Sequence, residues 1–150
     1  LINGIEPRQI SEQFYRNQCA AVSQRTFLFN DTIYNNIVYG ISDVTPAHYE
    51  QAIRLSGLDK VLRLLPDKER TIIGENGATL SGGEKQKISI ARALLKNANV
   101  IILDEPSNNL DKKSLYEIKC VLEKISHEKM VIVIDHNDIF EAVASLIINL

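Results

Sequence analysis

The sequence predicts an α/β fold in which a parallel sheet is interrupted by a helical insertion. Three runs rich in apolar and β-branched residues favour strands: Cys19–Ser23, Val100–Leu103 and Val131–Asp135. Each run is almost continuously apolar, which is typical of parallel strands covered on both faces. Residues 31–97 show helical patterns instead, with one weak strand candidate at Thr71–Ile73. An all-helical insertion is therefore expected between two strands of one α/β core.

Capping and breaking residues delimit the helices of this insertion. Thr, Ser and Asp favour the position before a helix, proline favours its first turn, and glycine favours the residue after its end. These signals predict helices at Thr32–Tyr39 after Asp31, at Thr45–Ser56 with Pro46 in the first turn and Gly57 as C-cap, and at Asp59–Leu65 before Pro66.

The last third of the chain alternates helix and strand signals. Apolar residues at helical spacing and a further apolar run near the end carry these signals. The expected elements are a helix from about Leu115 to Ile125 after Asp111, a short helix through Phe140 and Ala144 capped by Asn137 or Asp138, and a weaker or edge strand within Ala144–Leu150.

Composition places the chain among ordinary globular domains. It has 150 residues, 45% of them apolar, which is enough for one buried core, and its formal net charge is −2. That charge gives no broad basic surface, so no nucleic-acid partner is expected.

Cys19 and Cys120 are isolated in the sequence and predict buried thiols in a reducing compartment. No apolar run approaches the roughly 18 residues that cross a bilayer, and no secretory signal opens the sequence. These features are typical of a soluble cytosolic domain.

The motif Leu80-Ser81-Gly82-Gly83-Glu84 stands directly before a long helical pattern that runs to Leu95. A helix N-terminus carries unpaired N–H groups and partial positive charge, so it can hold a phosphate. The two glycines let the backbone approach a ligand closely, and the serine hydroxyl adds a hydrogen-bond donor. The same residues could instead form an ordinary helix cap. Both interpretations stay open on the motif alone.

Asp104-Glu105 closes the second predicted strand, and Pro106 ends the extended segment. Neighbouring residues of a strand point to opposite faces, so both carboxylates can serve one site only where the chain leaves the sheet. Paired carboxylates at that place can bind Mg²⁺ and orient a water molecule. The alternative is a solvated acidic turn, which the four apolar residues before the pair disfavour.

Two further polar residues stand at the ends of predicted strands, Gln24 after the first and His136 after the third. Ligands of open α/β sheets bind at the carboxyl ends of strands, so His136 and Glu105 could face one crevice, with Gln24 in an equivalent position. A single histidine is more often structural, and His48 and His127 are interpreted as surface residues. Together with the glycine motif, these strand-end residues predict nucleotide hydrolysis.

With these motifs in this order, the chain resembles the nucleotide-binding domain of an ATP-binding cassette (ABC) transporter. Leu80–Glu84 resembles the signature sequence of that family, Val100–Glu105 its Walker B strand, and Ser107–Asp111 the loop that meets the partner subunit. His136 resembles the switch histidine, and Gln24 the glutamine that links nucleotide to the transmembrane domain. The resemblance covers essentially all 150 residues. It implies a P-loop NTPase-type parallel sheet core with an inserted helical subdomain.

The resemblance also implies a domain organisation. Residues 1–150 would form the C-terminal portion of one ABC ATPase domain. Within it, residues 31–97 would be the helical and signature subdomain, and residues 1–30 and 98–150 would belong to the α/β core.

Two segments resemble exporters more than importers or repair ATPases. Gln24–Phe29, followed by Thr32-Ile33 and Asn36-Ile37, resembles exporter sequences after that glutamine, and Ile73–Gly77 resembles the exporter loop that touches membrane coupling helices. Peptide, bacteriocin and multidrug exporters are the most similar groups. An exporter implies transmembrane domains as partners and a location at the cytoplasmic face of the cell membrane.

The family mechanism implies ATP and Mg²⁺ as cofactors and a second nucleotide-binding domain as partner, with two ATP molecules sandwiched head to tail. The residues that would carry this chemistry are Glu105 as general base, His136 and Gln24 at the γ-phosphate, Asp104 and Gln24 at Mg²⁺, Ser81, Gly82 and Gly83 against the ATP of the opposite subunit, and Asp111 at the interface.

No G-x-x-x-x-G-K-[ST] phosphate loop occurs in the 150 residues. The sequence begins without Met, and Leu1–Gly4 has the pattern of a strand end entering a turn. We therefore expect a fragment that lacks the Walker A segment of its parent protein and binds ATP poorly alone. Two alternatives remain: a non-catalytic docking module, and a soluble ABC ATPase of DNA repair or translation, which the exporter-like segments disfavour.

Overall fold

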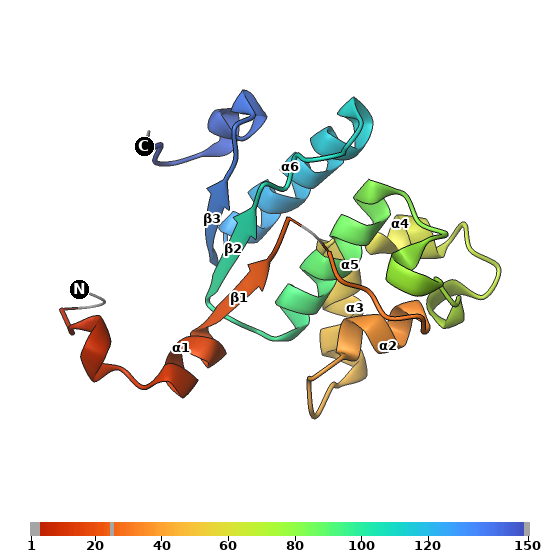
Figure 1. Cartoon of the computed structure of the whole chain (residues 1–150), viewed down its shortest axis with the longest axis horizontal. Coiled ribbons are helices and arrows are strands. Elements are labelled where there is room, and N and C mark those ends of the chain that lie inside the picture. Colours follow the sequence, from red (N-terminus) through yellow and green to blue (C-terminus); the bar gives the residue numbers. More distant parts are fainter. Residues whose placement is uncertain (1–3, 25, 149–150) are drawn as a thin grey trace.

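The computed structural model describes residues 4–24 and 26–148 and places a parallel sheet at the centre of the fold (Figure 1). Within these residues the sheet has the order β1-β2-β3, formed by β1 (Cys19–Val22), β2 (Val100–Asp104) and β3 (Met130–Ile134). Its register aligns Ala20 with Ile101 and Val131. The three main predicted strands and the α/β class are therefore confirmed.

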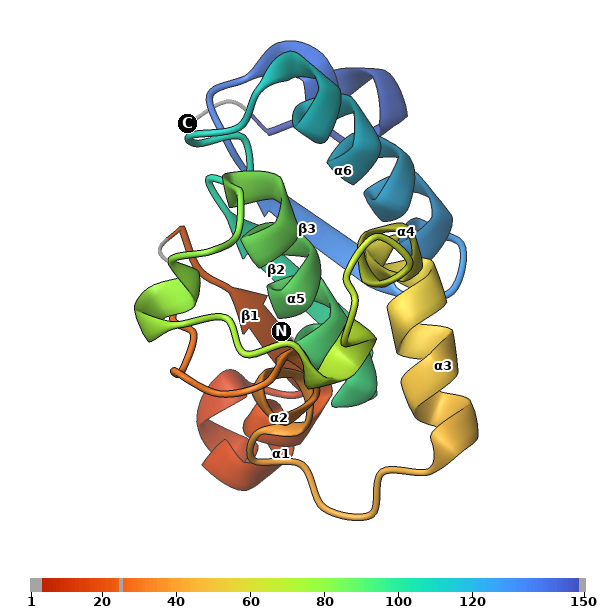
Figure 2. The same cartoon turned by 90° about the vertical axis from the view of Figure 1, so that its right-hand side faces the viewer.

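One face of the sheet is buried and the other is open in the described part of the chain. The helices α5 (Gly82–Leu95) and α6 (Lys112–Ser126) lie over the buried face (Figure 2). The residues of β1 and β2 that point toward them are at most 4% exposed: Ala20, Val22, Ile101 and Leu103. The outward residues of β3 are 42% to 63% exposed: Met130, Ile132 and Ile134. The expectation that both faces are covered is wrong for the described residues, because both helices cover the same face.

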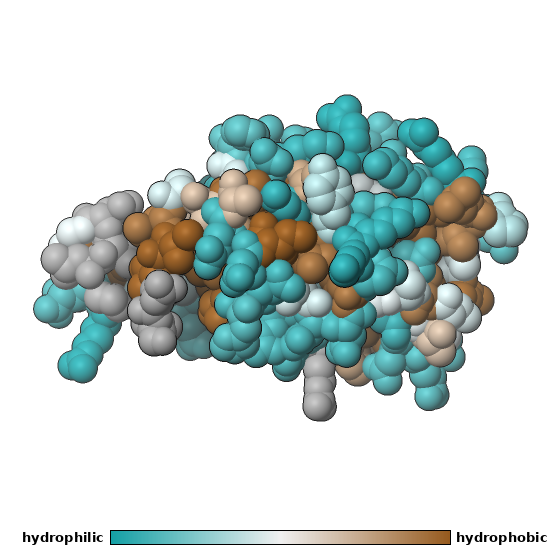
Figure 3. Space-filling view, turned by 90° about the horizontal axis from the view of Figure 1, so that it is seen from above, coloured by the Kyte–Doolittle hydropathy of each residue, from teal (hydrophilic) through white to brown (hydrophobic). Residues whose placement is uncertain are grey.

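The surface near the sheet is correspondingly apolar. Figure 3 shows brown, apolar side chains at several places on this side of the molecule, including the half that holds the sheet. Leu146, Ile147 and Ile148 are 76%, 50% and 72% exposed. The predicted edge strand at Ala144–Leu150 is wrong over its described residues, 144–148, which pair with no strand. An apolar, β-branched run has strand propensity, but forming a strand also requires a pairing edge, and this segment does not lie on β3.

The helices predicted between β1 and β2 are present as α2 (Ile33–Val38), α3 (Pro46–Leu55), α4 (Leu58–Leu62) and α5. The hydroxyl of Thr32 caps α2 by accepting a hydrogen bond from the Asn35 N–H at 3.0 Å. Thr45 caps α3 in the same way. Gly57 follows α3 with φ of +70°, a left-handed conformation that glycine adopts without strain. Helix α4 ends three residues earlier than predicted.

The sequence pattern misses one helix. Helix α1 (Glu12–Gln18) precedes β1 and is capped by Ser11, whose hydroxyl accepts from the Phe14 N–H at 3.2 Å. None of its residues is buried, so it carries no apolar periodicity that sequence reasoning could detect.

Shorter elements complete the described chain. Thr71–Ile73 forms an isolated bridge between Thr32 and Ile72 and no strand. Residues 1–3 of the strand end expected at Leu1–Gly4 lie outside the described residues. Four 3₁₀ helices are present in the described part: η1 (Pro7–Gln9), η2 (Lys68–Arg70), η3 (Glu75–Gly77) and η4 (Asp138–Val143).

Helix α5 lies at the centre of the hydrophobic core, between the sheet and the other helices of the insertion (Figure 2). Burying one large aliphatic side chain stabilises a fold by roughly 1.5–3 kcal/mol. Helix α5 has buried residues from Gly83 to Leu95, so the core holds it along almost its whole length. The largest side chains with less than 2% exposure are Leu28, Ile33, Ile37, Leu58, Ile73, Ile88, Ile90, Ile101, Leu103, Ile118 and Ile125.

Candidate functional site

The carboxyl ends of the three strands bring Gln24, Glu105 and His136 together. The side-chain amide of Gln24, just after β1, donates a hydrogen bond to Oε2 of Glu105, just after β2. Nε2 of His136, just after β3, lies 3.9 Å from the other carboxylate oxygen, Oε1. The His136 side chain is 94% exposed and that of Glu105 is 30% exposed, so both can be reached from solvent. The three side chains that were expected to face one crevice therefore lie together at the carboxyl end of the sheet, on an exposed surface.

Glu105 adopts a strained backbone conformation. Its φ is +46°, in the left-handed region that residues other than glycine seldom occupy. Such a conformation costs about 1–3 kcal/mol and persists where surrounding contacts enforce it. Here the Glu105 N–H donates to the carbonyl of Ile134 at 2.7 Å and ties the turn to the end of β3. This backbone bond and the Gln24 contact fix the carboxylate between the outer strands.

The loop from Glu105 to Asp111 is held in place by Asp135, the residue after β3. The Asp135 carboxylate accepts from the Ser107 backbone N–H at 2.9 Å and from the Ser107 hydroxyl at 2.6 Å. It also accepts from the Asn137 N–H at 2.8 Å. Asn108 in the same loop donates its side-chain amide to Oε2 of Glu105. The sequence interpretation placed Asn108 only in the loop that meets the partner subunit, and it did not predict that Asp135 holds this loop in place. The hydrogen bonds between Ser107 and Asp135 join residues 28 apart and leave no local sequence signal.

Asp104 is the last residue of β2 and is exposed. Its carboxylate is a hard oxygen donor, and the amide of Gln24 supplies a carbonyl oxygen of the same kind. Mg²⁺ typically takes one or two protein oxygens and completes its shell with water and phosphate oxygens. The residues at this edge of the sheet therefore fit Mg²⁺ bound together with a phosphate-bearing ligand.

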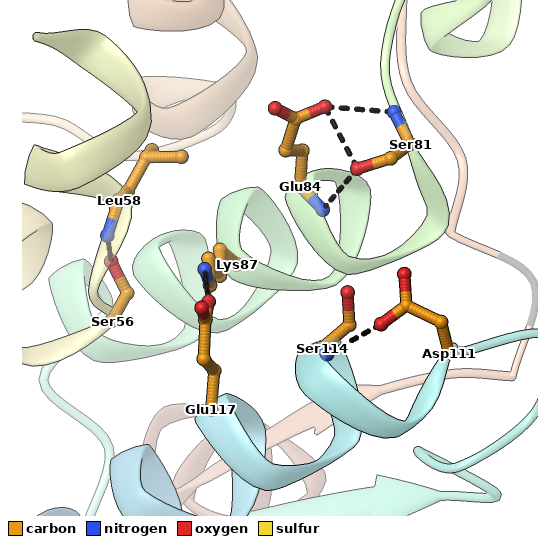
Figure 4. A network of polar contacts seen from close by, with 8 residues as sticks. All are labelled: Ser56, Leu58, Ser81, Glu84, Lys87, Asp111, Ser114 and Glu117. Carbon is orange, nitrogen blue, oxygen red and sulfur yellow. Dashed lines mark hydrogen bonds and ion pairs between the residues drawn. The ribbon is translucent and has the colours of Figure 1, made fainter. Parts of the chain in front are cut away.

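Ser81 begins α5 as part of a capping box (Figure 4). Its hydroxyl accepts from the Glu84 N–H at 3.4 Å, while the Glu84 carboxylate accepts from both the N–H and the hydroxyl of Ser81 at 2.8 Å. The ordinary capping role left open by the sequence is thus present. It does not exclude a ligand at the same helix end, because the capping box leaves other N–H groups of the first turn unpaired.

The two glycines after Ser81 allow α5 to approach the neighbouring loop and helix. A Cβ on Gly82 would lie 3.0 Å from the carbonyl oxygen of Asn109. A Cβ on Gly83 would lie 2.7 Å from the Ser114 hydroxyl oxygen and 2.8 Å from Ser114 Cβ. The sequence interpretation assigned these glycines to a ligand. The structure adds a second reason why Gly83 has no side chain, because α5 packs directly against α6 at this position.

Asp111 caps α6, as its sequence position predicts. Its carboxylate accepts from the Ser114 N–H at 2.7 Å. This backbone hydrogen bond, and after it the one from the Ser114 side chain, lower the pKa of the Asp111 carboxyl below its usual value. Asp111 is therefore a helix cap in the isolated chain, and its exposed position leaves it accessible to a partner.

The candidate residues thus fall into two groups. Gln24, Glu105 and His136 form one cluster at the carboxyl ends of the strands. Ser81–Gly83 and Asp111 lie at the first turns of α5 and α6 (Figure 4). The loop from Glu105 to Asp111 joins the two groups. At one end Asn108 donates to the Glu105 carboxylate, and further along the carbonyl oxygen of Asn109 lies against Gly82.

Comparison with known proteins gives concordant matches. A profile of the family described as "ABC transporter" matches residues 1–108. The chain is 41% identical over 135 residues to the "ATP-dependent lipid A-core flippase" of Legionella pneumophila (strain Lens), which covers 90% of the chain and 23% of that protein. It is 42% identical over 129 residues to "ATP-binding cassette sub-family B member 5" of Homo sapiens, which covers 86% of the chain and 10% of that protein. The chain spans less than a quarter of the length of these relatives.

A solved structure shares the fold. "Structure of a bacterial Atm1-family ABC exporter with ATP bound" matches with a TM-score of 0.80 and 31% sequence identity, covering 90% of this chain and 24% of that chain. Among the helices that the structure of our chain describes, none combines the length and apolar character needed to cross a bilayer.

Proposed function

This chain belongs to the ABC transporter ATPase family, and from that membership we propose that it forms part of an ATP-hydrolysing domain that powers export across a membrane. Transmembrane domains are its partners in this proposal, and the cytoplasmic face of the membrane is its location. Residues 31–97 act as the helical and signature subdomain, and the remaining residues belong to the α/β core. The observation that carries the proposal is the contact of Glu105 with Gln24 and His136 at the carboxyl ends of three parallel strands.

Glu105 acts as the general base. A carboxylate at the end of a buried strand can take a proton from a water that attacks the γ-phosphate. Gln24 and Asn108 both donate to the same oxygen of Glu105, which leaves its second oxygen, Oε1, to face the reacting water. His136, on the Oε1 side, contacts the γ-phosphate. These residues position the water and stabilise charge.

Asp104 and Gln24 hold Mg²⁺ through oxygen atoms. When bound, Mg²⁺ neutralises charge that develops on the phosphate oxygens. Gln24 would hold the metal through its side-chain oxygen while its amide N–H donates to Glu105, so a change at the metal and phosphate could reach Glu105 through it. This dual contact is the basis of its proposed sensing role.

A second nucleotide-binding domain completes the site in the proposed head-to-tail dimer. Ser81, Gly82 and Gly83 contact the ATP held by that second domain, and Asp111 lines the interface. Helix α5 has 14 residues, so its N-terminus carries the partial positive charge that favours a phosphate.

An aromatic surface after Gln24 is the proposed contact with the transmembrane domains. The ring centroids of Phe27 and Phe29 lie 4.9 Å apart, and those of Phe29 and Tyr39 lie 4.3 Å apart. Phe27 and Tyr39 are 61% and 60% exposed. Arg92 of α5 donates to the carbonyls of Phe27 and Asn36, which connects this surface to the core. Exposed aromatic residues on a rigid base are typical of binding surfaces.

Truncating Tyr39 is expected to weaken this contact. In the full-length protein, Tyr39→Ser should speed hydrogen exchange of residues 27–39 by about tenfold, since losing one aromatic anchor costs on the order of 1–2 kcal/mol of interface free energy. Tyr116→Ser is the matched control, because Tyr116 is also 60% exposed but lies on α6. Equal exchange rates in the wild type and Tyr39→Ser would place the contact elsewhere.

The ATPase proposal is tested by hydrolysis in the full-length protein reconstituted in lipid. We expect Mg²⁺-dependent release of phosphate from ATP, and a loss of about 100-fold in His136→Ala, within the range for losing one acid–base or phosphate-contacting side chain. The fold should tolerate this change, because the His136 side chain is 94% exposed. His127→Ala, at an exposed histidine outside the site, should hydrolyse ATP normally. A wild-type protein that binds ATP without hydrolysing it would favour the docking-module alternative.

A further inference from the structure

Lys87 is a buried lysine paired across two helices. It lies in the middle of α5 and is 6% exposed. Its ammonium group donates to Oε2 of Glu117 in α6 (Figure 4). Lysine is almost never fully buried unless it is paired, because an isolated charge in the protein interior is strongly destabilised. No sequence pattern predicts this pair, since the two residues are 30 positions apart.

The pair lies between the same two helices that meet at their first turns. Gly83 of α5 packs so closely on Ser114 of α6 that a Cβ would lie 2.8 Å from that of Ser114. Lys87 lies one helical turn after Gly83, and Glu117 lies about one turn after Ser114. Two successive contacts, one by close packing and one by charge, therefore hold α5 and α6 in a fixed register.

The surroundings keep Glu117 charged. The hydrogen bond from Lys87 lowers the pKa of Glu117 from its usual value of 4.5. Desolvation by burial acts in the opposite direction, and the positive charges of Lys87, Lys113 and Lys60 lower the pKa further. Those lysines come from α5, α6 and α4, so Glu117 faces positive charge from three helices. Glu117 is therefore ionised at neutral pH and accepts the hydrogen bond of Lys87 as a carboxylate.

The position of the pair connects the two groups of candidate residues. Helix α5 begins at Ser81–Gly83, and α6 begins directly after the loop that contacts Glu105 through Asn108. Fixing α6 against α5 therefore also fixes Glu105 relative to the first turn of α5. In the proposed dimer these two parts serve different ATP molecules, because Glu105 acts on the ATP of its own domain and Ser81–Gly83 on that of the partner.

We propose that Lys87 and Glu117 are positioning residues that lock α5 to α6, so that the Glu105 loop and the first turn of α5 move as one body and the two ATP sites of the dimer are coupled. This inference rests on the proposed function. Neither residue touches the nucleotide, and each acts through the helix that carries it.

The test uses four variants of the full-length protein. Glu117→Gln leaves Lys87 buried beside a neutral partner, and Lys87→Arg keeps the charge pair. The double variant Lys87→Met/Glu117→Leu replaces the pair by apolar groups of similar volume, a change that folds often tolerate. Arg63→Met removes an exposed ion pair with Asp59 and serves as control, since the Arg63 side chain is 78% exposed.

The readouts are the melting temperature, the dependence of hydrolysis on ATP concentration, and hydrogen exchange in the first turns of α5 and α6. In the double variant we expect an unchanged melting temperature and KM, a loss of about tenfold in kcat, and a Hill coefficient that falls toward one. Hydrogen exchange in the first turns of α5 and α6 should become faster in the double variant. Lys87→Arg, which keeps the charge pair, should have the wild-type melting temperature, kcat, Hill coefficient and exchange rates. Glu117→Gln should lose kcat like the double variant. The control Arg63→Met should leave all of these quantities unchanged.

Each result decides the proposal. A double variant with wild-type kcat, Hill coefficient and exchange would overturn it. A loss of kcat that only parallels a loss of melting temperature would also overturn it, because the pair would then be merely structural. If the wild type hydrolyses no ATP, the proposed function fails and the exchange data decide alone. Faster exchange in both first turns of the double variant then supports the lock, and unchanged exchange refutes it.

Discussion

Replacing Glu105 by glutamine is expected to lower ATP hydrolysis by the full-length protein about 1000-fold while ATP still binds. Loss of a general base typically costs 100-fold to 10,000-fold in rate. Glutamine keeps the size of the side chain and an oxygen that can accept from Gln24 and Asn108, so the local contacts survive. Only the basic oxygen that takes the proton is lost. The domain pair should therefore remain closed around unhydrolysed ATP.

Two measurements check this expectation. Steady-state phosphate release gives the loss of kcat, and radiolabelled ATP retained after rapid dilution reports trapping. Glu123→Gln makes the same chemical change at an exposed position of α6 and should behave like the wild type. Normal turnover in Glu105→Gln would refute the assignment of Glu105 as the base.

Gly83→Ala is expected to destabilise the domain by about 1–2 kcal/mol, although alanine normally favours a helix. An alanine in place of glycine stabilises an exposed helix position by up to about 1 kcal/mol. At this position the new Cβ would lie 2.7 Å from the Ser114 hydroxyl oxygen and 2.8 Å from Ser114 Cβ. Overpacking of this kind typically costs about 1–3 kcal/mol, so the steric term should prevail.

Pulse proteolysis of the full-length protein in urea gives the change in unfolding midpoint. Adding Ser114→Gly removes both clashing atoms and should recover most of the loss, whereas Ser114→Ala removes only the hydroxyl oxygen and should recover less. Stabilisation by Gly83→Ala alone would mean that α5 and α6 are farther apart than described, and that the glycine is present for another reason.

Much of the local structure is predictable because its causes are local. Thr45-Pro46, Ser81 and Asp111 begin helices as expected, because a capping side chain and the N–H groups it accepts from lie within three residues of each other. The meeting of Gln24, Glu105 and His136 also follows from a simple rule, since parallel strands end at one edge. Their chemical roles remain predictions.

The parts that sequence reasoning misses depend on long-range pairing. The Lys87–Glu117 and Ser107–Asp135 contacts join residues 30 and 28 apart, and no period or cap marks them. The run Leu146–Ile148 has strand propensity but stays outside the sheet. Likewise, the apolar composition of β3 shows that the strand suits burial, but not which of its faces a helix covers.

The left-handed backbone at Glu105 has a consequence for engineering this domain. Glycine would adopt φ of +46° without steric strain, so a library selected for thermal stability should enrich glycine there. The enriched variants would fold better and carry no carboxylate at the end of β2. If Glu105 is the base, stability and ATP turnover make opposite demands on this single position. A screen must therefore select for ATP hydrolysis as well as for folding if the glutamate is to be kept.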